Sequence, residues 1–193
     1  MMVVYQIYHL NLMFSSIEEN KYSDVIVNCY WPLLKLADYG IPIGIEVSGV
    51  TLEIIEKIDK SWIDKFAELL KSSKVELVAS GYSQIIGPLV PALMTEWNIK
   101  LGLEVYTRLL DTRPSIVLIN EMASSQGLID LYEKHGFKSV VLEWNNLLAT
   151  NNNVLDSDRF KPQLLKSRRS ARLRALWADS ISFQQFQRYV HCE

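Results

Sequence analysis

The glutamate at position 121 is the residue of this sequence best placed to do chemistry. It directly follows residues 115–120 (SIVLIN), an apolar run that predicts a buried strand, so its carboxylate should lie at the mouth of a sheet. A carboxylate held there can attack an anomeric carbon or move a proton, which makes Glu121 a candidate nucleophile. The structural alternative is that Glu121 helps to cap the helix that follows, within the segment EMASSQG.

Other polar and aromatic side chains stand where a predicted strand ends. His9 and Asn11 leave the first strand on the same side of the chain, and both could hydrogen-bond sugar hydroxyls. Tyr82 and Trp144 offer ring faces on which a sugar could stack, although either could equally be a core residue and His9 a partly buried one. The full set of strand-end residues is His9, Asn11, Glu46, Ser48, residues 80–84 with Gln84 last, Asn120, Glu121, Glu143 and Trp144.

The elements that must position these residues alternate regularly along the chain. Strands are predicted at residues 3–10, 41–47, 75–79, 115–120 and 138–144, with a sixth at 173–177. Helices are predicted from residue 15 or 16 to 39 with an interruption at Pro32, and at 51–58, 61–71, 95–110, 126–135 and 181–189. Strands that alternate with helices predict an α/β fold with a parallel sheet and helical crossovers.

The expected architecture is one domain over residues 1–193, with an irregular excursion at residues 145–175. The glycine-rich phosphate-binding fingerprint of dinucleotide-binding sheets does not follow the first strand. In a parallel barrel and in an open doubly wound sheet alike, ligands lie beyond the carboxyl ends of the strands. The strand-end residues are therefore either a binding site or the ordinary polar ends of such a sheet.

Composition narrows the class of partner. The net charge of −2 gives no general attraction to nucleic acid or to an anionic membrane surface, and we expect neither as a partner. We find no apolar run of about 20 residues and no leader pattern, so a cytoplasmic protein is expected. Residues 159–174 are rich in Lys and Arg; a solvated excursion beside the mouth is favoured there over a phosphate or acidic polysaccharide contact.

Metal and cofactor chemistry fit the sequence poorly, and no cofactor is expected. It has three histidines and two cysteines, with no H-x-x-x-H pair, no C-x-x-C pair and no Asp-Asp after the first strand. A zinc-dependent deacetylase would need such groups. The G-x-S-x-G elbow of serine hydrolases is also missing.

Five segments, in this order, resemble the N-terminal catalytic domain of glycoside hydrolase family 57, whose barrel is related to polysaccharide deacetylases. The resemblance runs from about residue 3 to 190. The segments are residues 9–11 (HLN), 45–53 (IEVSGVTLE), 80–86 (SGYSQII), 119–123 (INEMA) and 177–183 (WADSISF).

The resemblance implies a seven-stranded parallel β/α barrel, complete or incomplete, that cleaves or transfers α-glycosidic bonds of an oligo- or polysaccharide with retention and without metal. It implies Glu121 as the nucleophile, and His9 and Tyr82 as sugar-binding residues. Gln84 stands where the family often has Glu, and no Asp-x-Glu-x-Phe-Gly segment supplies the family's acid/base. Two alternatives stay open: a sugar-binding barrel without catalysis, and a polysaccharide deacetylase-like enzyme.

Overall fold

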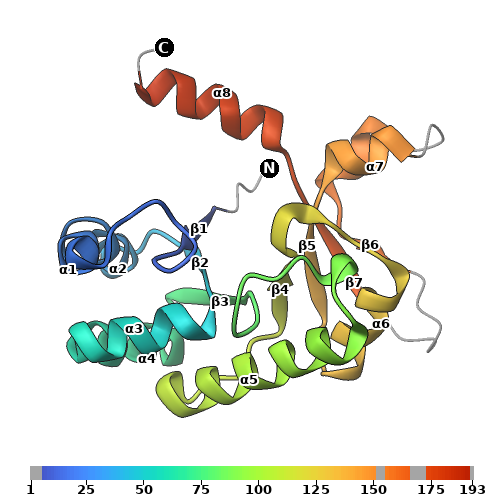
Figure 1. Cartoon of the computed structure of the whole chain (residues 1–193). Helices are drawn as coiled ribbons and strands as arrows, with labels where there is room; N and C mark the ends of the chain where they lie inside the picture. The colour runs from blue at the N-terminus through green and yellow to red at the C-terminus, as the bar shows by residue number, and fades with distance from the viewer. Residues whose placement is uncertain (1–5, 151–154, 166–172, 192–193) are drawn as a thin grey trace.

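The computed structural model describes residues 6–150, 155–165 and 173–191, which form a seven-stranded sheet of order β1-β2-β3-β4-β5-β7-β6 with helices around it (Figure 1). The strands are β1 (Ile7–Leu10), β2 (Ile43–Val47), β3 (Val75–Ala79), β4 (Ile116–Leu118), β5 (Ser139–Glu143), β6 (Gln163–Leu164) and β7 (Arg174–Ala178). All neighbouring strands are parallel except β6, which runs antiparallel to β7.

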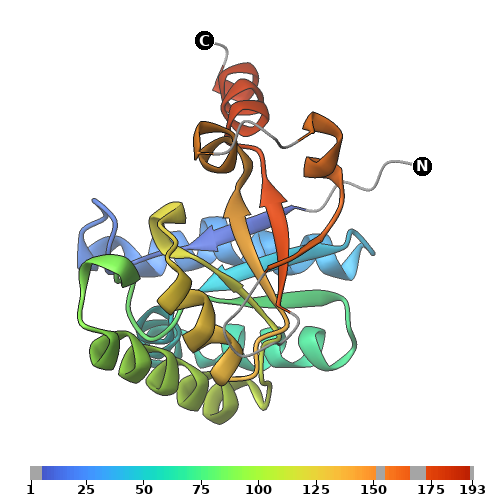
Figure 2. The same ribbon diagram turned by 90° about the vertical axis from the view of Figure 1, so that its right-hand side faces the viewer.

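The sheet is an incomplete barrel, because β1 and β6 are its two ends and do not pair with each other. The predicted α/β class and mostly parallel sheet are confirmed. The antiparallel β6 was not predicted, since two residues are too few to show a strand pattern. Figure 2 shows how strongly the sheet twists, with β5 and β7 running across the direction of β1 and β2.

The helices between successive parallel strands form the crossover connections, and α8 follows the last strand. The helices are α1 (Tyr22–Val25), α2 (Trp31–Asp38), α3 (Gly49–Ile58), α4 (Lys60–Lys71), α5 (Ala92–Leu110), α6 (Gln126–Lys134), α7 (Trp144–Thr150) and α8 (Ser180–His191). Short helical turns are η1 (Glu19–Lys21), η2 (Ile26–Tyr30), η3 (Gly87–Leu89), η4 (Asn120–Met122) and η5 (Asp156–Phe160). The predicted interruption at Pro32 is real: a π-helical turn, η2, precedes α2, and Pro32 lies in the first turn of α2.

The main core lies between the sheet and the helices. Ile45 and Val47 of β2 belong to this buried apolar cluster together with Trp62 and Phe66 of α4, whose ring centroids are 5.0 Å apart. Because side chains alternate along a strand, Glu46, between Ile45 and Val47, points to the opposite face of the sheet. That alternation directs one buried carboxylate away from the helix layer.

Helix α5 buries only part of its apolar stripe, and Val105 is the buried member. Trp97 and Leu101 lie on an apolar stripe with Val105, yet Trp97 is 53% exposed and Leu101 is 39% exposed. The buried face also includes Ile99, Gly102 and Tyr106. Gly102 decides the orientation of α5, because a Cβ at this position would lie 2.6 Å from the backbone carbon of Gly81.

Residues 145–175 were predicted to form an irregular excursion, and residues 151–154 and 166–172 of this segment lie outside the described residues. Its described parts hold most of α7, the turn η5, strand β6 and the start of β7. Helix α8 then projects away from the sheet (Figure 1), and its residues 181–190 are exposed. Among the residues described, no helix combines the length and apolarity needed to cross a membrane. That the chain forms one domain stays a prediction.

Candidate functional site at the carboxyl ends of the strands

A histidine and a buried glutamate lie side by side at the ends of β1 and β2. The strand register pairs His9 with Glu46, and His9 Nδ1 makes a hydrogen-bonding contact with Glu46 Oε2. The Glu46 side chain is 0% exposed, and its other oxygen, Oε1, is buried and has no hydrogen-bond partner in the described part of the chain. An orphaned buried carboxylate oxygen is costly, so Glu46 is a residue that packing alone would not favour.

Two amide side chains continue this contact on the solvent side of His9. Gln84 Nε2 lies 3.0 Å from His9 Nε2, and Asn11 Nδ2 donates to Gln84 Oε1 at 3.0 Å. Asn11 Oδ1 in turn accepts from the backbone N–H of Phe14 at 2.9 Å. The structure therefore brings together three of the predicted site residues, His9, Asn11 and Gln84, in one hydrogen-bonded group.

The pKa of His9 depends on the groups that surround it. The hydrogen bond to Glu46 raises the pKa of His9 above its ordinary value of 6.5, partial burial opposes that rise, and the charges of Glu46 and Glu121 add to it. Glu121 is thus close enough to His9 to act on it electrostatically. This connects the predicted nucleophile with the β1–β2 group.

Glu121 lies in the turn η4 immediately after β4, with its side chain exposed at the mouth of the sheet. Its backbone has φ 53° and ψ 17°, and that of Met122 has φ 51°, so two consecutive non-glycine residues occupy the left-handed region. Each costs roughly 1–3 kcal/mol and persists only where the surroundings enforce it, which is a pattern typical of functional sites. Ser125, not Glu121, caps α6, because its side chain accepts from the backbone N–H of Leu128.

The residue before Glu121 fixes this turn to the neighbouring loop. Asn120 Oδ1 accepts a hydrogen bond from Ser80 Oγ at 2.8 Å, and Asn120 Nδ2 lies 3.3 Å from the carbonyl oxygens of Ser80 and Ile85. Asn120 and Ser80 are both buried. The loop after β3, which carries Gln84, is therefore tied to the loop after β4, which carries Glu121.

Helix α5 holds the other side of the Gln84 loop. Asn98 accepts from the backbone N–H of Ser83 at 2.7 Å and donates to the carbonyl oxygen of Ser83 at 3.0 Å. Tyr106 donates its hydroxyl proton to the carbonyl oxygen of Val47 at 2.7 Å and accepts from the N–H of Ser80 at 3.1 Å. These bonds fix the ends of β2 and β3 relative to each other.

Two predicted stacking residues are not brought to this group. The Tyr82 hydroxyl donates to Glu53 Oε2 of α3 at 3.0 Å, which directs the ring toward the helices. Trp144 is 1% exposed and packs edge-on against Trp177, with ring centroids 5.2 Å apart. In this structure neither ring offers a free face beside Glu121.

A second buried glutamate, Glu143, is the last residue of β5, at the far side of the mouth. Glu143 Oε1 accepts hydrogen bonds from the backbone N–H of Asn145 at 3.2 Å, from Asn145 Nδ2 at 2.6 Å and from the backbone N–H of Ser180 at 3.2 Å. Ser180 is the first residue of α8. Glu143 therefore joins the loop after β5 to the start of the last helix.

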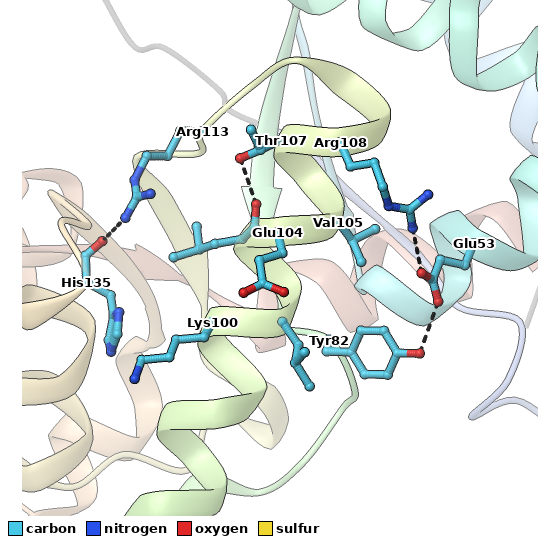
Figure 3. Close-up of a pocket in the computed structure, with 11 residues that line it drawn as sticks. Glu53, Tyr82, Lys100, Glu104, Val105, Thr107, Arg108, Arg113 and His135 are labelled. Carbon is cyan, nitrogen blue, oxygen red and sulfur yellow. Dashed lines mark hydrogen bonds and ion pairs between the residues drawn. The ribbon is translucent and has the colours of Figure 1, made fainter.

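Two cavities in the described part of the chain lie away from Glu121, along α5. The larger, of about 860 Å³, is drawn in Figure 3, where Tyr82 and Arg108 point toward Glu53 and Arg113 reaches His135. The smaller, of about 460 Å³, lies between the start of α5 and α6. Glu121 lines neither cavity.

Glu46 is the residue whose role the sequence did not assign. Its signal is a single carboxylate inside the otherwise apolar strand IGIEV. Sequence reasoning placed Glu46 at the rim but could not pair it with His9, because the pairing depends on the register of β1 and β2. No group of three His, Cys, Asp or Glu residues that could hold a metal occurs among the residues described.

In β/α-barrel enzymes the active site lies at the carboxyl ends of the parallel strands, which is where Glu121 lies in this incomplete barrel. The family model of Glycosyl hydrolase family 57 matches residues 4–184, and the chain belongs to this family.

A curated relative and several solved structures resemble parts of this chain. An α-amylase of Pyrococcus furiosus is 27% identical over 93 residues, which cover 43% of this chain and 14% of the relative. The 4-α-glucanotransferase of Thermococcus litoralis matches with a TM-score of 0.81 and 16% identity, over 94% of this chain and 28% of that one. The α-amylase AmyC of Thermotoga maritima matches with a TM-score of 0.73 and 14% identity, over 92% of this chain and 46% of that one. The structural matches show the fold, and the chain spans less than half the length of each of these relatives.

Proposed function

We propose that this chain is part of the catalytic barrel of an enzyme that hydrolyses or transfers α-glucan chains with retention, and that Glu121 is its nucleophile. The α-amylase and 4-α-glucanotransferase among its relatives support an oligo- or polysaccharide substrate. Membership of a glycosyl hydrolase family supports glycosidic bond chemistry.

One observation carries the role of Glu121: an exposed carboxylate stands at the mouth of the sheet on a strained turn. The backbone of Glu121 and Met122 is left-handed, and Asn120 anchors the turn to the loop after β3. A nucleophile must be held still within reach of the anomeric carbon, and such a turn does so. Around it, His9, Asn11 and Gln84 present the polar groups that we propose bind sugar hydroxyls.

Trapping with an activated substrate tests this role without requiring an acid/base residue. In a 5-fluoro-α-glucosyl fluoride the leaving fluoride needs no proton. An oxygen of Glu121 forms a bond to C1 as the C1–F bond breaks, and the ester that results hydrolyses slowly. We expect one added glycosyl mass per chain, located by peptide mass spectrometry on the peptide that contains Glu121.

The matched variants are Glu121→Gln and Glu104→Gln. Glu104 is an exposed glutamate of α5, so its variant removes an equal charge away from the mouth. We expect Glu121→Gln to abolish labelling and to lower turnover of α-glucan by about 10³-fold or more, and Glu104→Gln to leave both unchanged. Labelling on another residue, or unchanged labelling of Glu121→Gln, would refute the assignment.

A sugar-binding barrel without catalysis is the second candidate. Retention by two carboxyl groups needs a partner about 5–5.5 Å from the nucleophile. The two buried glutamates of the rim are already engaged, Glu46 by His9 and Glu143 by three N–H groups. Binding of maltooligosaccharides without any trapped glycosyl group would favour this candidate.

A further inference from the structure

The hydrogen-bond chain around His9 has only one possible direction, and its starting point is the backbone of Phe14. A backbone N–H can only donate, so the Asn11 atom that it contacts at 2.9 Å is the carbonyl oxygen Oδ1. The other terminal atom of Asn11 is then the amide nitrogen, which can only donate. The Gln84 atom that it contacts at 3.0 Å must therefore be the oxygen Oε1.

The same reasoning reaches the imidazole of His9. With Oε1 turned to Asn11, Gln84 directs its Nε2 donor at His9 Nε2, 3.0 Å away. His9 Nε2 must then be the acceptor, and the ring proton must be on Nδ1, where it is donated to Glu46 Oε2. Each group in the chain donates a hydrogen bond to the next, from the backbone N–H of Phe14 through Asn11, Gln84 and His9 to the buried carboxylate.

We propose that Asn11, Gln84 and Glu46 are positioning residues that hold His9 as its neutral Nδ1–H tautomer, and that protonation of His9 requires the Gln84 amide to rotate. A proton on His9 Nε2 would face the NH₂ group of Gln84, donor against donor. Rotation of the Gln84 amide relieves this contact, but it turns the NH₂ group toward Asn11 Nδ2 and breaks the Asn11–Gln84 hydrogen bond.

The charged groups that act on His9 are Glu46 from β2 and Glu121 from η4, and both favour the protonated ring. Gln84, from the loop after β3, opposes them. Residue 84 therefore decides whether Glu121 faces a neutral acceptor or a cation. This inference concerns the sugar-binding part of the proposed site, but it holds whether or not the chain cleaves a glycosidic bond.

Nitrogen-15 NMR of the histidine side chains tests the proposal directly. His9 is assigned by the loss of its signals in His9→Gln, and His135 on α6's far end serves as the internal reference. Above the titration midpoint of His9 we expect the Nδ1–H tautomer. The side-chain NH₂ signals of Asn11 and Gln84 should shift with the same midpoint as His9, because rotation accompanies protonation.

Two variants separate positioning from a merely structural role. Gln84→Glu replaces the opposing donor with a carboxylate, and should raise the pKa of His9 by about one to three pH units and remove the coupled shift of Asn11. Glu46→Gln should lower the pKa of His9 and weaken the tautomer preference. Gln126→Glu, on the exposed first turn of α6, adds an equal charge elsewhere and should change neither.

The proposal fails if wild-type His9 is the Nε2–H tautomer, or if Gln84→Glu leaves the pKa of His9 unchanged while the His135 signals show an intact fold. Both readings are independent of turnover and of glycosyl trapping. A failure here leaves the role of Glu121 untouched, and failure to trap a glycosyl group on Glu121 leaves this result standing.

Discussion

Two buried glutamates, Glu46 on β2 and Glu143 on β5, lie at the carboxyl ends of their strands but differ in their hydrogen-bond partners. Glu143 accepts three hydrogen bonds from N–H groups of Asn145 and Ser180, none of which can change its charge at neutral pH. Among the residues that the structure describes, Glu46 bonds to His9, whose charge can change, and its Oε1 has no hydrogen-bond partner.

This difference separates a structural carboxylate from a functional one. Amide donors fix local geometry and stabilise a loop, which is what Glu143 does for the start of α8. A titratable partner stabilises the carboxylate by an amount that changes with pH, so we expect Glu46 to contribute less to the stability of the fold than Glu143 does. The predictions below test this contrast.

Replacing each glutamate with leucine should give the largest difference. Glu143→Leu leaves three N–H donors without their acceptor, and we expect the free energy of unfolding to fall by about 2–3 kcal/mol. Glu46→Leu removes an orphaned buried oxygen and frees a half-exposed His9 to meet water, so the change should be below about 1 kcal/mol. Urea denaturation of both variants at pH 7 measures this. Equal losses would contradict the contrast.

The next largest effect is expected at Asn120, which joins the β3 and β4 loops of the Glu46 side. Asn120→Ala leaves the Ser80 hydroxyl and two carbonyl oxygens without their partner, which should cost about 1–2 kcal/mol of unfolding free energy. Hydrogen exchange of residues 81–86 should quicken, while that of residues near Ser180 should not. If hydrogen exchange became equally faster in residues 81–86 and near Ser180, the Glu46 side and the Glu143 side of the sheet would not be independent.

The pH-dependent part of the unfolding free energy should also differ between Glu46→Leu and Glu143→Leu. The difference should be less than about 1 kcal/mol, because the His9 side chain is about half exposed. The pKa of His9 is raised in the folded state, so its contribution is fully present below its unfolded pKa of about 6.5 and is lost as the pH rises through the folded pKa. Wild type should therefore lose stability relative to Glu46→Leu between pH 6 and pH 9. Glu143→Leu should show the same pH dependence as wild type over this range.

The smallest effect is expected in α8 beyond the residue that Glu143 holds. Phe186 is 59% exposed, so Phe186→Ser should change the free energy of unfolding by less than about 0.5 kcal/mol. Phe66→Ala, in the fully buried cluster of α4, is the matched change and should cost about 3–5 kcal/mol. A large loss in Phe186→Ser would show that α8 contributes to the stability of the sheet.

The sequence predicted most of the elements, because apolar runs and helix-ending residues are local signals. The third strand, residues 75–79, matches β3 residue for residue, and the sixth predicted strand overlaps β7. It also placed Glu121 immediately after the fourth strand and His9 at the end of the first. Apolar spacing alone does not give the buried face of α5, because the orientation of this helix depends on the contact between Gly102 and Gly81.

By itself, then, the sequence determined that strands alternate with helices and which polar residues lie where the strands end. Only the tertiary structure decided that Glu46 faces His9, that Tyr82 turns to Glu53 and that Trp144 is buried. Strand periodicity specifies the side of a sheet on which a residue lies. Its neighbour on the next strand follows from register and from loop packing, and these depend on residues tens of positions away.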